Sequence, residues 1–143
     1  MLVGLLIGGR VLYADRVDAE HIGGIFRQTE RVHDAFETAA GRVLLGHAEQ
    51  AAWEQARAAS PIGVAFDDKD RDAWASAPWL AVERTEPAGA VEVAVPVRDR
   101  SGRVVAALSA LAAAKAMGED VHPERAAVLV RAAKAAGQAV GDV

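Results

Sequence analysis

Carboxylates and histidines are the side chains of this sequence that could perform acid and base chemistry. The histidines are dispersed along the chain, at His21, His33, His47 and His122. None of them stands at a recognised metal-ligand spacing from another histidine or a carboxylate. Glu83, Glu86 and Glu92 are the acidic residues nearest to apolar stretches. Acid and base catalysis needs two such groups in different environments, so an enzyme that uses Glu92 or Glu83 with His33 or His47 is one hypothesis.

The signatures of common nucleophilic and phosphate-binding enzymes are absent. The chain contains no cysteine, which excludes disulfides, thiolate metal sites and a cysteine nucleophile. It has neither a Gly-x-Ser-x-Gly elbow nor a glycine-rich loop that ends in Gly-Lys-Ser/Thr. The sequence therefore predicts a protein that is not an enzyme and that holds no metal and no cofactor.

Length and charge narrow the class of protein further. At 143 residues the chain predicts one domain, residues 1–143, that is large enough to bury a hydrophobic core. Its 16 basic and 20 acidic residues give a net charge of −4, and the dispersed basic residues disfavour direct contact with nucleic acid. No apolar run reaches the roughly 18 residues of a membrane helix, and the N-terminus lacks the basic start of a signal peptide. We expect a cytoplasmic protein without membrane contact.

Strict alternation marks the stretch from Val91 to Leu111 as a β-hairpin. Valines occupy every second position of its first half, at Val91, Val93, Val95 and Val97. A polar turn with a glycine, residues 98–103, leads to a second apolar run from Val104. The valine face predicts a core. Glu92 lies on the other face, which is either solvated or turned to a pocket, and Ser109 binds either backbone or a small polar ligand.

The remaining elements predict an α+β arrangement. Gly8-Gly9 favours a type I′ turn between two opening strands, and Pro96 indicates a sheet edge, a bulge or a strand end. Further strands are expected over His21–Phe26 and Trp79–Val82. Helices are expected over Asp34–Leu45, over Ala48–Ala58, through Trp74 and from Pro123 onward. Asp34 would cap the first of them. The result is an antiparallel sheet of about five or six strands flanked by helices.

Two stretches carry motifs whose order and spacing can be compared with a known family. The first is AFETAAGRVLLGH, in which residues 41–45 are similar to a Gly-Lys-Ala-Leu-Leu-like run. The second is GAVEVAVPVRDRSGRVVAALSAL, with an Ala-x-Pro-Val strand end, an Asp-x-x-Gly turn and a serine-containing strand. Together with the closing amphipathic helix, this order resembles the effector-binding domain of IclR-type bacterial transcriptional regulators over nearly the whole chain.

The resemblance implies a GAF-like or profilin-like fold with a pocket for a small metabolite, usually an organic or aromatic acid. It also implies a helix that starts at about Ala39, later than a cap at Asp34 would give. By position it assigns to the pocket Ala39, Ala40, Glu92, Ser109 and an acidic position that falls at Val82 or, with one inserted residue, at Glu83. The carboxylate at Glu92 departs from the family pattern and disfavours an anionic ligand unless a group is protonated or a cation intervenes.

We therefore expect a non-catalytic small-molecule sensor domain that modulates DNA binding by a separate or missing domain. The family's winged helix-turn-helix is not among these 143 residues. The expected partners are a small-molecule effector and further copies of the chain, in a dimer or a tetramer. A dimerisation or interaction module without a ligand is the alternative, and a small enzyme that uses Glu92 or Glu83 is a further one.

Overall fold

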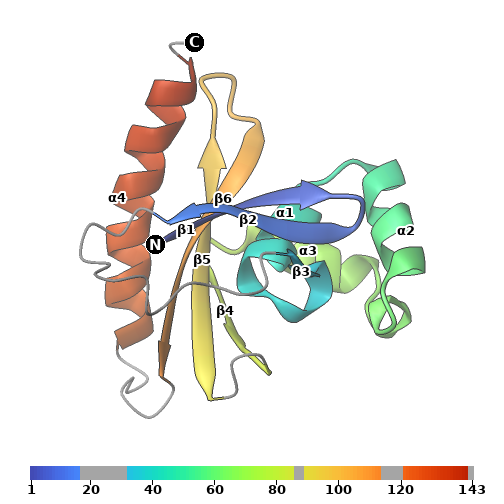
Figure 1. Ribbon diagram of the computed structural model, residues 1–143. Helices are drawn as coiled ribbons and strands as arrows, with labels where there is room; N and C mark the ends of the chain where they lie inside the picture. The colour runs from blue at the N-terminus through green and yellow to red at the C-terminus, as the bar shows by residue number, and fades with distance from the viewer. Residues whose placement is uncertain (17–31, 86–88, 114–120, 142–143) are drawn as a thin grey trace.

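The protein, seen in a computed structural model, has an α+β fold (Figure 1). The structure describes residues 1–16, 32–85, 89–113 and 121–141. The strands are β1 (Leu2–Ile7), β2 (Arg10–Arg16), β3 (Val32–Asp34), β4 (Leu80–Glu83), β5 (Ala90–Arg98) and β6 (Val104–Ala113). The helices are η1 (Ala35–Glu37), α1 (Ala39–Gly46), α2 (Gln50–Ala59), η2 (Gly63–Ala65), α3 (Asp68–Ser76) and α4 (Val121–Gly141). The strand expected at His21–Phe26 lies outside the described residues.

The strands of the described residues form one antiparallel sheet in the order β3-β2-β1-β6-β5-β4. Its hairpins β1-β2 and β5-β6 are the two that alternation and turn residues predict. Gly8 and Gly9 have φ angles of 56° and 84°, as a type I′ turn requires. Strands β1 and β6 join the hairpins, with Leu2 opposite Ser109. The expected fold class is confirmed, with β3 as a short edge strand that the sequence analysis did not predict.

Helices cover both faces of the sheet. Figure 1 shows α4 along one face, and α1 with α3 on the other, with α2 beyond them. The core under α4 contains Val93, Val95, Val97, Ala106, Leu108, Ala126, Leu129 and Ala133. The core under α1 contains Leu2, Val11, Tyr13, Ala39, Ala40, Val43, Leu44, Val82, Ala94 and Ala107. The face of β5 that carries Glu92 is therefore buried against α1 and is not solvated.

Pro96 lies inside β5, although a proline cannot donate a hydrogen bond to a neighbouring strand. Strand β4 pairs with β5 only between Val91 and Ala94, so it ends before Pro96. The pairing of β5 with β6 shifts directly after Val97. At Pro96 the strand thus has a neighbour on one side only, which confirms the sheet edge that the sequence predicts.

The stretch from Asp34 to Gly46 forms two helices, η1 and α1, because each has its own N-cap residue. Asp34 accepts a hydrogen bond from the Phe36 amide at 2.8 Å and caps η1. Thr38 then adopts an extended backbone, and its hydroxyl accepts a hydrogen bond from the Gly41 amide at 2.9 Å. A single helix from Asp34 onward is therefore wrong, and the start at Ala39 that the resemblance implies is confirmed.

An aromatic cluster fixes α1 against α2 and α3. It consists of Phe36, Trp53, Phe66 and Trp74, whose contacting ring centroids lie 5.2–6.1 Å apart. The Arg42 guanidinium lies 5.1 Å from the Phe66 centroid, and its Nε donates to the Phe36 carbonyl at 2.8 Å. Because α1 is packed in this way on its outer side, its first turn has a fixed place over the sheet.

Helix α4 approaches β5 closely at Gly137. A Cβ atom at this position would stand 2.0 Å from the carbonyl oxygen of Arg98. Glycine inside a helix normally costs about 1 kcal/mol relative to alanine. The close contact between helix and strand gives a physical reason for a glycine here.

Gly137→Ala should destabilise the protein by about 1–3 kcal/mol, because the new methyl group forces α4 away from β5. Urea unfolding followed by circular dichroism measures this change in the free energy of unfolding. Ala135→Gly, at an exposed position of the same helix, is the matched control and should cost about 1 kcal/mol through helix propensity alone. A Gly137→Ala protein more stable than wild type would contradict this account of the packing.

Candidate functional site

Four of the residues that the resemblance assigns to a pocket meet on one side of the sheet. Ala39 and Ala40 begin α1, Glu92 lies on β5 and Ser109 on β6. All four are fully buried. Ser109 lies opposite Ala94, two residues along β5 from Glu92, so both polar side chains belong to the face that α1 covers. The structure brings these residues together, and their binding role remains a prediction.

The structure does not bring Glu83 to this site. Val82 is buried and lies opposite Glu92 on the neighbouring strand. Because side chains alternate along a strand, Glu83 points to the other face, where it is exposed. Of the two positions that the resemblance offers for an acidic residue, Val82 is the one that faces the site. The next inward residue is Arg84, which is buried.

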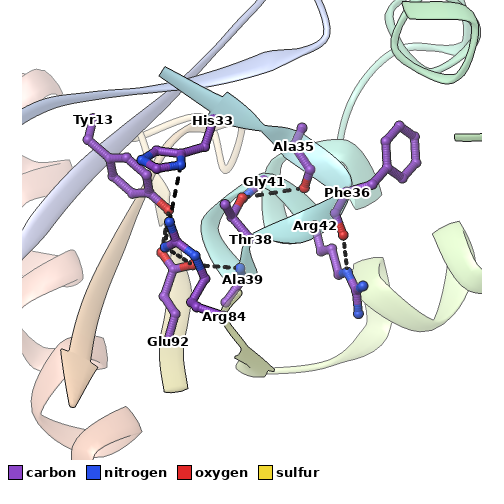
Figure 2. A network of polar contacts seen from close by, with 10 residues as sticks. All are labelled: Tyr13, His33, Ala35, Phe36, Thr38, Ala39, Gly41, Arg42, Arg84 and Glu92. Carbon is purple, nitrogen blue, oxygen red and sulfur yellow. Dashed lines mark hydrogen bonds and ion pairs between the residues drawn. The ribbon is translucent and has the colours of Figure 1, made fainter. Parts of the chain in front are cut away.

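The carboxylate of Glu92 is held by three donors, as Figure 2 shows. The Ala39 amide donates to Oε1 at 2.7 Å, and the Tyr13 hydroxyl donates to Oε2 at 2.6 Å. The Arg84 guanidinium donates to Oε1 at 3.2 Å and forms a buried ion pair with Glu92. The first amides of a helix have no acceptor within the helix and lie at its positive end. The first turn of α1 therefore binds an anion, and that anion is a side chain of the same protein.

Arg84 connects this carboxylate to two further side chains. Its Nη1 lies 3.4 Å from the Tyr13 hydroxyl oxygen, and its Nη2 lies 3.3 Å from Nδ1 of His33. A guanidinium can only donate, so the His33 nitrogen is the acceptor. The ring of His33 also contacts the ring of Tyr13 edge-on, with centroids 5.5 Å apart. Arg84 and Glu92 depend on each other, because either charge would be costly to bury alone.

Tyr13 stands between the ion pair and the apolar core. Burial raises the pKa of its hydroxyl, and the negative charge of Glu92 and the hydrogen bond to it raise this pKa further. The positive charge of Arg84 acts in the opposite direction but is outweighed. Tyr13 therefore remains a protonated donor to the carboxylate over the whole ordinary pH range.

Ser109 is different from the other polar groups of the site. Its hydroxyl is buried, with 0% of the residue exposed, and it has no hydrogen-bond partner. A buried hydroxyl without a partner costs about 1–3 kcal/mol. Glu92 is also 0% exposed, so neither side chain borders a space that admits a water molecule. These two side chains are thus shielded from solvent, and the Ser109 hydroxyl is left unsatisfied.

A separate cavity of about 510 Å³ lies between α4, the end of α3 and the end of β5. Its lining includes Val95, Pro96, Arg98, Val130, Ala133 and Lys134. Its volume falls within the usual range for ligand pockets. None of the residues that the sequence assigns to a site lines this cavity.

Three residues of the network are not among those predicted from the sequence: Tyr13, Thr38 and Arg84. Alternation could have placed two of them on buried faces, because Tyr13 follows Val11 and Arg84 follows Val82 at strand spacing. Thr38 precedes the small-residue helix start and is a preferred N-cap type. The sequence carries no local signal that Tyr13 and Glu92, 79 positions apart, form a hydrogen bond.

Comparisons with known proteins give the fold a family context. No protein family and no curated protein matches the sequence. A protein from Rhodococcus sp. RHA1, assigned as a transcriptional regulator, is similar with a TM-score of 0.79 at 22% identity, over 99% of this chain and 60% of its own. An IclR homolog from Microbacterium hydrocarbonoxydans, complexed with 4-hydroxybenzoate, has a TM-score of 0.66 at 23% identity, over 94% of this chain and 60% of its own. The inducer-binding domain of a double mutant of PobR from Acinetobacter, complexed with 3-hydroxybenzoic acid, has a TM-score of 0.73 at 16% identity, over 96% of this chain and 86% of its own.

The chain therefore has the fold of the effector-binding domains of IclR-type transcriptional regulators, as its motifs predict. It spans about 60% of the length of the Rhodococcus and Microbacterium proteins. Among the helices of the described residues, none has the length and apolar character that crossing a membrane requires.

Tyr13 is the only tyrosine of the chain, so its ionisation can be followed directly. The unfolded chain should ionise near a pKa of about 10, and the folded protein above it. The stabilising contribution of Tyr13 is thus fully present below about pH 10 and is lost as the pH rises further. In an alkaline titration, tyrosinate absorbance should appear only together with loss of the circular dichroism signal. Tyrosinate that forms near pH 10 in a folded protein would count against the buried contact, and the chain in denaturant is the control.

The mutual dependence of Arg84 and Glu92 predicts strongly non-additive stability changes. Arg84→Met should cost about 3 kcal/mol or more, because it leaves the Glu92 charge buried without its cation. Adding Glu92→Gln to that variant should recover part of the loss, since no buried charge then remains. Urea unfolding of both variants and the double variant tests this. Glu83→Gln, an exposed carboxylate on the neighbouring strand, is the control and should change stability by less than about 0.5 kcal/mol. Additive losses would refute the dependence.

Proposed function

We propose that this chain is the small-molecule-sensing domain of a bacterial transcriptional regulator of the IclR type. The observation that carries the proposal is the burial of Ala39 and Ala40, in the first turn of α1, on the sheet face that also carries Glu92 and Ser109. These are residues that the family resemblance assigns to an effector pocket. Two proteins with the same fold are complexed with hydroxybenzoates, which supports small organic molecules as the ligand class of this fold.

The proposal includes a way in which binding could be transmitted. Helix α1 is held from the sheet side through Ala39 and Glu92, and from the outer side by the aromatic cluster. A ligand that enters between α1 and the sheet must bind one arrangement of α1 more tightly than another to shift their populations. The change would reach a DNA-binding partner through self-association, as a dimer or a tetramer, because this acidic chain is poorly suited to hold DNA itself.

A specific observation favours a second function, that of an interaction module without a ligand. Glu92 and Ser109 are 0% exposed, so the two polar side chains that would meet a ligand are shielded from solvent. We propose no catalytic role for this site, because the Glu92 carboxylate already accepts hydrogen bonds from three donors. Glu83 is exposed on the other face of β4.

Thermal unfolding in the presence of metabolites tests the sensor against the module. A panel should contain matched anionic, uncharged and cationic aromatic compounds. A ligand at a hundredfold its dissociation constant adds about 2.7 kcal/mol of stability, which raises the melting temperature by several degrees. Failure of every class to shift the wild-type melting temperature would favour the interaction module.

Two variants then locate the binding site of any compound that shifts the melt. Ser109→Ala should leave the unliganded protein as stable as wild type or more stable, because it removes an unsatisfied hydroxyl. The same substitution should weaken the binding of a ligand that lies under α1. Lys134→Glu, in the 510 Å³ cavity beside α4, is the control and should not affect such a ligand. The opposite pattern would move the sensing site to that cavity.

A further inference from the structure

The first turn of α1 contributes the Ala39 amide to a carboxylate-binding position, which we call the carboxylate seat. The Tyr13 hydroxyl and the Arg84 guanidinium complete it, and a side chain from β5 occupies it. The Glu92 Oε1 atom accepts the Ala39 amide at 2.7 Å, although the two residues are 53 positions apart in the sequence. Helix N-termini favour anions through unpaired amides and the helix dipole. Thr38 satisfies the Gly41 amide from within the turn, at 2.9 Å. Glu92 accepts a hydrogen bond from a different amide of this turn, that of Ala39.

A second observation is that this largely apolar layer contains further buried polar groups beside Glu92. The hydroxyl of Ser109 is fully buried without a partner, on the same sheet face as Glu92 and opposite Ala94, two residues along β5. Arg84 reaches the layer from the end of β4 and supplies the charge that balances the carboxylate, at 3.2 Å. The layer thus contains an anion, its cation and an unused hydrogen-bonding group.

We propose that Glu92 is an internal ligand that fills the carboxylate seat of α1 and thereby excludes effectors that present a carboxylate. For its regulatory meaning this inference rests on the proposed function, whereas the occupation of the seat does not. An incoming carboxylate would find the Ala39 amide, the Tyr13 hydroxyl and the Arg84 guanidinium already engaged. It would also stand beside a buried negative charge. Glu92 therefore sets the ligand class of the wild-type protein to molecules without a carboxylate.

The inference predicts that removal of Glu92 opens the seat to an external carboxylate of matching size. Glu92→Ala deletes one methylene and the carboxylate, a fragment equivalent to acetate. Acetate should then bind between Ala39, Tyr13 and Arg84, and it should raise the melting temperature of the variant saturably, by about 5 °C or more at high occupancy. Acetamide, which has the same shape without the charge, should not do so. All samples are compared at equal ionic strength with chloride.

Wild type and Glu83→Ala are the matched controls. Glu83→Ala removes an exposed carboxylate from the strand next to Glu92, so acetate should leave the melting temperature of both proteins unchanged. The Ala39 amide resonance supplies a direct readout by NMR. It should shift with acetate in Glu92→Ala, and it should not shift with 4-hydroxybenzoate in wild type.

A refolding measurement covers the case in which Glu92→Ala does not fold, since the variant buries the Arg84 charge unpaired. Dilution from denaturant should then give folded protein in acetate and much less in chloride or acetamide. The inference is overturned if acetate and acetamide act alike on the variant, or if wild type binds hydroxybenzoate at the Ala39 amide. Acetate binding by Glu92→Ala, combined with a wild type that binds no metabolite, would sustain this inference and overturn the sensor proposal alone.

Discussion

The hydrogen bond from the Ala39 amide to the Glu92 carboxylate joins the first turn of α1 to the middle of the sheet. A carboxylate buried at this depth is stable only if every strong donor it needs is buried with it. This requirement determines the places of Tyr13 on β2 and Arg84 after β4. The apolar layer between α1 and the sheet therefore also contains buried polar side chains, while the cluster under α4 is formed by apolar side chains.

The fold of this chain is shared with proteins of very different sequence. The similar regulators share 16–23% of their residues with this chain, and yet their TM-scores are 0.66–0.79. Alternating apolar positions and hairpin turns are enough to specify the sheet and its covering helices. The polar groups under α1 are few, so they can change without loss of the fold. In this chain the charges of Arg84 and Glu92 balance each other.

The elements that the sequence predicts correctly are those with a strong local signal. Alternation specifies the β5-β6 hairpin, paired glycines specify the β1-β2 turn, and an acidic first turn indicates the short helix α3. The split of the predicted helix at Thr38 was missed because Asp34 and Thr38 are both good N-cap residues. The sequence does not show that each of them caps a separate helix, η1 and α1. For the site, family position supplied Ala39, Ala40, Glu92 and Ser109. It could not supply Arg84, whose partner is set by the pairing of β4 with β5 and not by nearby sequence.

The pairing of β1 with β6 has a consequence for the order in which the chain can fold. These strands lie at the centre of the sheet, and they bring Leu2 next to Ser109 and Gly4 next to Ala107. During synthesis, the two hairpins can each form from local contacts, but the sheet stays in two halves until the last strand leaves the ribosome. Tyr13 belongs to the first half and Glu92 to the second. Burial of the carboxylate is therefore one of the latest events of folding, completed in the same step that makes the sheet whole.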